Sequence, residues 1–258
     1  MNIKLGCDPE AFLKKDNKLV SAYGLIPGSK EQPHKVKNGM VQVDGMAVEF
    51  GIDPASTEEE WGYNIESVLQ QMQEMIPQHE LALTPTAEFG KEYIDLQPDE
   101  AKMLGCEPDY CAYKAGENSM PDGSMGIRTA GGHVHIGWTD KPNANHGTQA
   151  VELVKQLDFY LGLPSLLFDK DMKRRSMYGQ AGAYRVKDYG VEYRSLSNAW
   201  LTSKQLISLI YTNTKGAVSS LLRGGSLYST YPHIQQVINE SDSVEAKRIL
   251  DLEGIAYV

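Results

Sequence analysis

Three short segments of this 258-residue chain each carry two chemically active side chains two residues apart. Side chains at positions i and i+2 of a β-strand point to the same face, so each pair can act at one site. The pairs are Asp8 with Glu10, His133 with His135, and Glu192 with Arg194. A single pair is also typical of an ordinary solvent-exposed sheet face. The three pairs together favour a shared site.

A fourth acidic segment, residues 43–50, contributes Asp44 and Glu49. A continuous strand would turn these two side chains to opposite faces, whereas a turn or bulge at Gly45 would bring them to one side. Carboxylates combined with histidine are ligands for hard divalent cations, above all Mg²⁺ and Mn²⁺. Carboxylates from four strands therefore predict a site for two or three such ions, which phosphoryl transfer from a nucleotide requires.

The sequence around the histidines and around Glu192 is unusual for a solvent face. Gly132 and Gly137 flank the two histidines, and glycine weakens a strand unless another group approaches closely. Glu192 is interpreted as a strand-face carboxylate that neighbouring acids repel. On that interpretation Glu192→Ala abolishes activity and leaves the fold intact.

Basic residues concentrate in the segment from Lys170 to Arg194, which has seven lysines and arginines against three acids, a net charge of +4. The planar guanidinium group suits phosphate and carboxylate recognition. Arg185 and Arg194 are the strongest candidates, because they lie in β-like sequence. Further candidates for nucleotide binding are Arg128, Arg174 and Arg175. No glycine-rich phosphate loop or dinucleotide fingerprint is present, so a nucleotide would bind through metals and arginines.

The composition excludes several classes of protein. The net charge of −9 disfavours a nucleic-acid or anionic-membrane binder. The most apolar stretch, residues 157–168, is too short to span a bilayer. Three cysteines form no disulfide framework, which favours a cytoplasmic protein and predicts that Cys7, Cys106 and Cys111 are core residues.

The hydrophobic pattern predicts one α+β domain over residues 1–258, with an antiparallel sheet and helices packed on one face. Its C-terminal part, from about residue 200, is expected to be helical. Strands are predicted at 11–14, 18–22, 40–51, 131–138 and 190–196. Helices are predicted at 58–76, at 149–161 with a stop at Gly162 and Pro164, from Ser203 to Gly224, and after an Asp242–Glu245 capping box. Strands and loops are expected over 77–130.

These motifs resemble the superfamily of glutamine synthetase and glutamate–cysteine ligase. Gly6-Cys7-Asp8-Pro9-Glu10 resembles its Glu-x-Glu metal strand, with Asp8 in place of the first Glu. Gly131-Gly132-His133-Val134-His135 resembles its glycine-rich histidine strand, and Glu192-Tyr193-Arg194 its late Glu-x-Arg strand. Asp44 and Glu49 fall where the superfamily places its middle pair of carboxylates, at a tighter spacing. The phage-type carboxylate–amine ligases are the most similar, through residues 185–198.

The resemblance implies a curved antiparallel sheet around a funnel-shaped active site, with helices on the outer face. It implies an amide-forming ligase that uses ATP and Mg²⁺ or Mn²⁺ and proceeds through an acyl phosphate. One ion would be held by Glu10, Asp44 and Glu49 beside the amine, and another by Asp8, His133 and Glu192 at the ATP phosphates. Glu192 also counts among the catalytic residues.

The resemblance also implies roles for the remaining side chains. Arg194 and Arg185 would neutralise the transferred phosphoryl group, with Arg174 or Arg175 nearby. His135 would support His133 or line the nucleotide pocket. The substrates would be small-molecule or peptide carboxylates and amines, in the host cytoplasm for a phage protein, and the chain would be a monomer or a homo-oligomer.

Two other hypotheses remain open at this point. One is a cupin-like metal enzyme that uses His133 and His135 together with Asp140. The other is a non-catalytic, virion-associated binding protein on a ligase-like scaffold.

Overall fold

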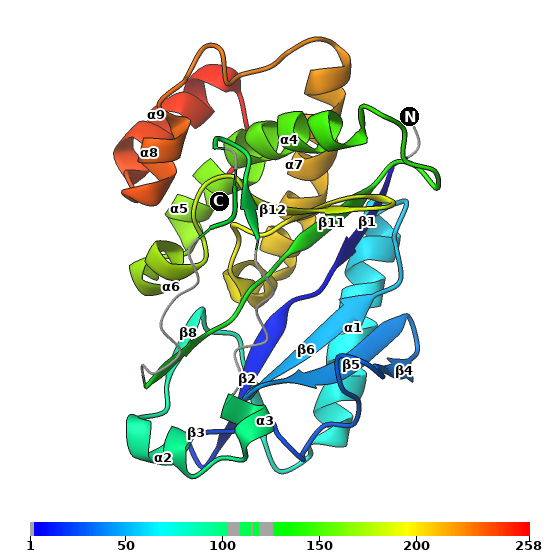
Figure 1. The fold of residues 1–258 in the computed structure, drawn as a ribbon, viewed down its shortest axis with the longest axis vertical. Coiled ribbons are helices and arrows are strands. Elements are labelled where there is room, and N and C mark those ends of the chain that lie inside the picture. Colours follow the sequence, from blue (N-terminus) through cyan, green and yellow to red (C-terminus); the bar gives the residue numbers. More distant parts are fainter. Residues whose placement is uncertain (1–2, 103–108, 115, 119–125) are drawn as a thin grey trace.

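The computed structural model describes residues 3–102, 109–114, 116–118 and 126–258 (Figure 1). These residues form helices together with antiparallel sheets, which confirms the predicted α+β class. The strands pair in more than one sheet, whereas the sequence predicted a single one.

The first sheet has the strand order β1-β11-β13-β12-β9. Its strands are β1 (Lys4–Cys7), β11 (Val134–Gly137), β13 (Gly190–Tyr193), β12 (Ala183–Lys187) and β9 (Tyr110–Cys111). The second sheet has the order β3-β2-β6-β5-β4, and β7 also pairs with β2. Its strands are β2 (Glu10–Lys15), β3 (Lys18–Val20), β4 (His34–Val36), β5 (Gly39–Asp44), β6 (Ala47–Ile52) and β7 (Glu80–Ala82). A two-stranded sheet joins β8 (Thr86–Glu88) to β10 (Ile127–Thr129).

Strands β1 and β2 follow one another through the two large sheets and are interrupted at Asp8-Pro9. Proline has no amide hydrogen to donate to a ladder, which is a physical reason for the break. Main-chain bonds continue across it, because Glu10 donates to the carbonyl of Gly131 at 3.0 Å and Phe50 donates to that of Pro9 at 3.0 Å. The break therefore lies where the first sheet meets the second, and Asp8 and Glu10 do not share one regular strand.

Helices cover the sheets. They are α1 (Glu58–Met75), α2 (Lys91–Asp95), α3 (Asp99–Lys102), α4 (His146–Leu157), the π-helix η1 (Asp158–Gly162), α5 (Leu163–Phe168), α6 (Met172–Met177), the 3₁₀-helix η2 (Asn198–Thr202), α7 (Lys204–Leu222), α8 (Ile234–Asn239) and α9 (Ser243–Glu253). Helix α1 packs on β5 and β6, and α4 packs on β12 and β13. Helix α7 contacts both α1 and α4, and Trp61 stacks on Trp200 at 5.8 Å between ring centroids. Helices α8 and α9 lie at the opposite end of the molecule from α2 and α3 (Figure 1).

The predicted stop after residue 161 is wrong, since α4 continues through η1 and α5 to Phe168. Pro164 lies in the first turn of α5, where a missing amide hydrogen costs little. Gly162 serves close packing instead, because a Cβ there would meet Ile238 at 2.8 Å and the Tyr193 hydroxyl at 3.0 Å. Asp158 starts the π-helix as a buried carboxylate that accepts hydrogen bonds from the Tyr193 and Tyr113 hydroxyls.

Other local predictions fare differently. The region 77–130, predicted to hold only strands and loops, also forms α2 and α3. Asp242 caps α9, but Glu245 completes no capping box, because its carboxylate binds Arg248 and His233. Cys7 and Cys111 are buried as predicted, and Cys106 lies outside the described residues.

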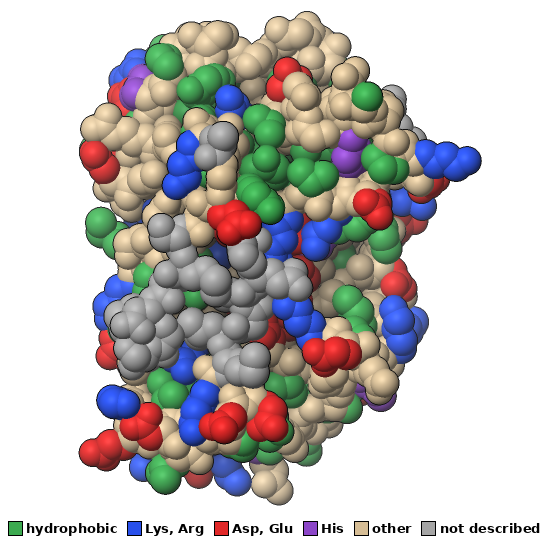
Figure 2. All heavy atoms as spheres, in the orientation of Figure 1, with side chains coloured by type: hydrophobic (Ala, Val, Ile, Leu, Met, Phe, Trp, Pro, Cys, Tyr) green, Lys and Arg blue, Asp and Glu red, His purple; other side chains and the backbone are tan. Residues whose placement is uncertain are grey.

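No helix in the described part of the chain is long and apolar enough to cross a membrane. The face seen in Figure 2 mixes basic and acidic side chains over most of its area.

Candidate active site

The polar pairs meet where β1, β11, β13 and β12 lie side by side. Four residues form one cross-strand row, in the order Gly6, His135, Glu192 and Arg185. Directly cross-strand residues share a face of an antiparallel sheet. Gly6 has no side chain, so on β1 nothing projects from that face beside His135. The sheet register therefore gathers residues that are up to about 180 positions apart in the sequence onto one face.

The first group of candidate ligands, here called the mixed cluster, consists of Asp8, His133 and Glu192. One donor atom from each of them lies within 4.8 Å of the others. His133 Nδ1 is 3.3 Å from Asp8 Oδ1 and 3.6 Å from Glu192 Oε1. This group has the composition that the sequence predicted for the ion at the ATP phosphates.

The second group, here called the acidic cluster, consists of Glu10, Asp44 and Glu49. Its carboxylate oxygens also lie within 4.8 Å of one another. Glu10 and Glu49 face each other across β2 and β6, and Asp44 ends β5. The tight turn at Gly45, with φ of +58°, joins β5 to β6 and brings both acids of this hairpin to one side. The sequence predicted this composition for the ion beside the amine.

Charges within the mixed cluster compensate one another. Burial opposes ionisation of Asp8, but His135 and His133 hold its pKa well below the usual range. Burial also opposes ionisation of Glu192, but Arg194 and the two histidines bring its pKa down to about 2. Burial together with Arg194 lowers the pKa of His133 to about 4, which leaves a neutral imidazole able to act as a ligand.

The carboxylates of the acidic cluster repel one another, and burial together with this repulsion raises their pKa values. Burial and Asp44 raise the pKa of Glu10 to about 7. Burial and the nearby Asp8, Glu10 and Asp44 raise the pKa of Glu49 well above its usual value. Burial likewise raises the pKa of Asp44. Gln42 donates a hydrogen bond of 2.9 Å to Glu49, and the Gly131 amide donates one of 2.6 Å to Glu10, but neither donor carries a positive charge.

Glu192 is buried among cations, which overturns its interpretation as a carboxylate that neighbours repel. Its side chain is 1% exposed and pairs with Arg194 Nη1. Lys187 Nζ lies 2.8 Å from Glu192 Oε2, and Arg185 Nη1 lies 3.8 Å from Oε1. The same burial argues against the expectation that Glu192→Ala spares the fold. Removing this acid would leave several buried cations uncompensated.

Close approach at the two glycines that flank the histidines is confirmed for Gly132 but not for Gly137, where a Cβ would meet no atom nearer than 3.6 Å. A Cβ on Gly131 would lie 2.4 Å from the His133 ring, and one on Gly132 would lie 2.2 Å from the Ser197 carbonyl. Asn198 also donates a hydrogen bond of 2.8 Å to the main-chain carbonyl of Glu10. The main chain around the site is thereby fixed by contacts from three separate segments.

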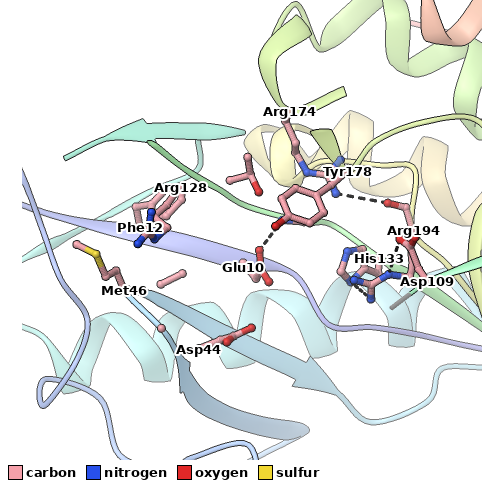
Figure 3. A pocket seen from close by; sticks show the side chains of 14 residues that line it. Glu10, Phe12, Asp44, Met46, Asp109, Arg128, His133, Arg174, Tyr178 and Arg194 are labelled. Atoms are coloured by element: carbon pink, nitrogen blue, oxygen red, sulfur yellow. Dashed lines mark hydrogen bonds and ion pairs between the residues drawn. The ribbon is translucent and has the colours of Figure 1, made fainter. Parts of the chain in front are cut away.

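A pocket opens beside the two clusters (Figure 3). Its lining includes Glu10 and Asp44 from the acidic cluster and His133 from the mixed cluster. Basic side chains in its wall are Arg128, Arg174 and Arg194, and the remaining lining includes Phe12, Met46, Ala47, Asp109 and Tyr178. In Figure 3, Arg128 lies near Phe12, on the other side of Glu10 from His133 and Arg194.

The predicted nucleotide-binding residues divide into two sets. Arg174 lines the pocket, where its guanidinium donates to the main-chain carbonyls of Ser195 and Arg194. Arg175 does not reach it, because its guanidinium donates to the Ser241 hydroxyl and lies 3.8 Å from Asp169. His135 joins the mixed cluster from its edge, with Nε2 3.0 Å from Asp8 Oδ1 and a hydrogen bond between Nδ1 and the Tyr189 hydroxyl.

The sequence reasoning did not single out some side chains that the structure places here. Lys187 lies two residues after Arg185 on β12, so the same i, i+2 spacing was a signal for it. Asp109 lies 3.4 Å from Arg194, and Gln42 binds Glu49, but neither has a sequence pattern that marks it. Asp140, the third ligand of the cupin-like hypothesis, is exposed and belongs to neither cluster.

The donor sets fit divalent cations. The acidic cluster offers only oxygen, as Mg²⁺ prefers, and the mixed cluster adds one neutral imidazole. Asp8 Oδ1 and Glu192 Oε2 are buried and lie within ion-pair distance of cationic groups without completing a well-directed hydrogen bond. Bound cations would satisfy such atoms and relieve the repulsion among Glu10, Asp44 and Glu49.

Comparison with known proteins gives one family match. Residues 108–243 match a family model described as phage phiEco32-like COOH.NH2 ligase-type 2. The matched segment covers just over half of the chain and contains His133, Glu192 and Arg194 but not the acidic cluster. No curated protein matches this sequence.

Proposed function

The chain belongs to the phage phiEco32-like COOH.NH2 ligase-type 2 family, and on that premise we propose that it joins a carboxylate to an amine using Mg²⁺ and ATP. The family name supports a ligase that forms a C–N bond. The use of ATP, the metal and the acyl-phosphate route are our proposal. The observation that carries it is the pair of three-ligand clusters beside one arginine-lined pocket.

The proposed reaction has two steps. A carboxylate oxygen of the substrate attacks the γ-phosphorus of ATP, the bond to the bridging oxygen breaks, and ADP leaves with an acyl phosphate remaining. The amine nitrogen then attacks the acyl carbon, phosphate leaves, and the nitrogen loses a proton to give the amide. Mg²⁺ ions, when bound, would offset the charge of the phosphates and hold them in position.

The residues of this chain have distinct tasks in that scheme. Asp8, His133 and Glu192 would hold the ion at the phosphates, and Glu10, Asp44 and Glu49 the ion nearer the amine. Arg194 stabilises the charge that develops on the transferred phosphoryl group, because its guanidinium lies in the pocket wall and is fixed by Glu192 and Asp109. Arg174 in the pocket wall and Arg185, 3.8 Å from Glu192, add positive charge.

The fold supports the same proposal. Two antiparallel sheets meet at the site, with α1 on β5 and β6 and α4 on β12 and β13. We propose that β1 and β2, which follow one another across the break at Asp8-Pro9, form part of the wall of a funnel-shaped, glutamine-synthetase-like site. Asp140 is exposed, so the cupin-like alternative has no observation in its favour among the described residues.

Thermal unfolding of the purified protein with ATP, with Mg²⁺ and with both together tests the proposal. Ligand at about 100 times its Kd stabilises the native state by about 2.7 kcal/mol, so a specific site gives a clear shift. We expect the large shift only with both together, followed by Mg²⁺-dependent phosphate release when substrates are supplied. Glu66→Gln, which alters an exposed acid paired with Lys204, is the matched control and keeps the shift. No shift with Mg²⁺ and ATP together would overturn the proposal and favour the non-catalytic hypothesis.

A further inference from the structure

The turn between β12 and β13 places a tyrosine beside the mixed cluster. Tyr189 directly precedes β13, and its hydroxyl is hydrogen-bonded to Nδ1 of His135 on β11. The two rings are stacked, with 6.0 Å between their centroids and an angle of 28° between their planes. Tyr189 is 39% exposed, whereas the side chain of His135 is 18% exposed, so the pair leads from the surface toward the buried ligands. No step of the proposed reaction uses this tyrosine.

The main chain fixes the position of Tyr189 relative to β11. The Trp138 amide, directly after that strand, donates a hydrogen bond of 2.9 Å to the Tyr189 carbonyl. A Cβ on Gly190 would lie 1.9 Å from the main-chain carbonyl of Ile136, so glycine is required for the turn to approach the strand this closely. The tyrosine side chain therefore starts from a fixed point beside the strand that carries the second histidine.

The other ring nitrogen of His135 reaches a ligand of the mixed cluster. Nε2 lies 3.0 Å from Asp8 Oδ1, and the same oxygen lies 3.3 Å from His133 Nδ1. A lone pair on Nε2 would face the carboxylate, so Nε2 carries a hydrogen. In the neutral ring Nδ1 is then the acceptor, and the Tyr189 hydroxyl donates to it. A charged ring has a hydrogen on both nitrogens and keeps the same contact with Asp8.

We propose that Tyr189 is a positioning residue, which fixes the His135 ring so that this ring holds the Asp8 carboxylate for the cation at the ATP phosphates. This inference rests on the proposed function and adds a residue that acts through His135 rather than on the substrates. Groups that hold metal ligands from behind set the orientation of those ligands, and their loss typically lowers metal affinity about 10- to 100-fold. Phenylalanine at position 189 would keep the stacked ring but leave Nδ1 without the hydroxyl, so the imidazole and Asp8 could turn away from the cation.

Titration of the nucleotide-free protein with Mn²⁺, followed by electron paramagnetic resonance, tests this assignment. Mn²⁺ accepts both oxygen and imidazole ligands, so it reports on both clusters. We expect two binding steps in the wild type, and Glu49→Gln identifies the step at the acidic cluster by weakening it. Tyr189→Phe should weaken the other step about 10- to 100-fold and leave the acidic-cluster step unchanged. A general loss of structure would weaken both steps.

Further variants separate positioning from other effects of the substitution. His135→Asn should weaken the same Mn²⁺ step, and the double variant His135→Asn with Tyr189→Phe should bind no more weakly than His135→Asn alone, because the tyrosine acts through that ring. Tyr63→Phe is the matched control. It removes an exposed hydroxyl that is hydrogen-bonded to Lys37 at 3.0 Å, and it should leave both steps unchanged.

Nuclear magnetic resonance of the metal-free wild-type protein gives a readout that needs no variant. The chemical shifts of the His135 ring nitrogens show which of them carries a hydrogen. We expect a hydrogen on Nε2, the nitrogen that faces Asp8. A neutral ring with its hydrogen on Nδ1 alone would overturn the assignment, even if Tyr189→Phe does not fold.

The outcomes separate this inference from the proposed function. If the wild type binds Mn²⁺ in two steps and Tyr189→Phe changes neither, the role of Tyr189 is overturned and the ligase proposal stands. Additive losses in the double variant, or a wild type that binds Mn²⁺ only at the acidic cluster, overturn it as well. If the wild type binds neither Mn²⁺ nor Mg²⁺ with ATP, the proposed function itself fails and this inference fails with it.

Discussion

The two ligand clusters lie next to each other, but the buried charges of one are balanced by opposite charges and those of the other are mainly alike. In the mixed cluster, Glu192 is surrounded by Arg194, Lys187 and His133, so every acid has a cationic or hydrogen-bonding neighbour. In the acidic cluster, the same number of ligands brings three carboxylates within 4.8 Å of one another, and the hydrogen-bond donors to two of them, Gln42 and the Gly131 amide, carry no charge.

The difference predicts which half of the site would respond more strongly to a bound metal. The mixed cluster is stable by itself, because buried acids that pair with arginine and lysine are compensated within the protein. In the acidic cluster, burial and the neighbouring acids outweigh the attraction of Arg174 and Arg194, so the pKa of Glu10 rises to about 7 and that of Glu49 rises well above its usual value. We therefore expect a bound cation to change the acidic cluster far more than the mixed one, and the following predictions test that contrast.

The largest effect is expected from Glu192→Gln. The substitution keeps the size of the side chain but removes the negative charge that Arg194, Lys187 and Arg185 share. Breaking a buried pair of this kind costs about 3–5 kcal/mol of the free energy of unfolding. Urea unfolding of the metal-free protein measures it, with Glu66→Gln as the exposed control, for which less than about 1 kcal/mol is expected. A loss as small as that of the control would show that the mixed cluster does not stabilise the fold.

Arg194→Lys should act on turnover more than on stability. A lysine retains the positive charge but cannot contact Glu192 and Asp109 together as the guanidinium does. We expect kcat, measured as phosphate release from ATP in the presence of Mg²⁺, to fall about 10²- to 10³-fold. Arg248→Lys on the exposed face of α9 is the matched control. Near-normal turnover of Arg194→Lys would remove this residue from the catalytic machinery.

Glu49→Gln should change stability in the opposite direction from Glu192→Gln. Burial and the neighbouring acids raise the pKa of Glu49, so folding with this carboxyl costs free energy above pH 4.5, at most about 1.4 kcal/mol per pH unit, and a glutamine carries no such cost. The metal-free variant is therefore expected to unfold at a higher urea concentration than the wild type and to gain less from added Mg²⁺. A variant that is destabilised without metal and still gains the full effect of Mg²⁺ would contradict the contrast between the two clusters.

The smallest effect is expected in the pH dependence of stability, measured with a chelator present. The folded-state pKa of Glu10, about 7, lies above its ordinary value of 4.5, so its contribution is present below pH 4.5 and is lost as the pH rises through 7. The folded-state pKa of Glu192, about 2, lies below its ordinary value of 4.5, so its contribution is present above pH 4.5 and is lost as the pH falls through 2.

The two groups thus predict slopes of opposite sign, each at most about 1.4 kcal/mol per pH unit. Glu10→Gln should reduce the slope between pH 4.5 and 7 without removing it, because the raised pKa of Glu49 gives a slope of the same sign, and Mg²⁺ should flatten the slope in the wild type. A slope in that range that persists unchanged in Glu10→Gln would assign it to another group.

Local features of the fold followed from the sequence. Each i, i+2 pair places one member in a strand, since Glu10, His135 and Glu192 lie in β2, β11 and β13, while their partners lie one or two residues outside these strands. His135 and Glu192 form one cross-strand row with Arg185. Ser203 caps α7, as the sequence predicted, because its hydroxyl oxygen accepts a hydrogen bond from the Leu206 amide. The helix predicted to end at residue 161 continues beyond it. Gly162 packs against Ile238 and Tyr193, which are distant in sequence, so the local sequence could not show that this glycine serves packing.

The composition of each cluster was available from the sequence through motifs and a family resemblance, because ligand type and strand parity are local properties. The tertiary structure alone decided the charges around them. Lys187 and Asp109 reach Glu192 and Arg194 through strand pairing and chain packing, and Arg175 turns away to Ser241. Burial and the sum of neighbouring charges depend on segments distant in sequence, so only the folded chain decided which cluster is compensated within the protein and which one is expected to respond to a cation.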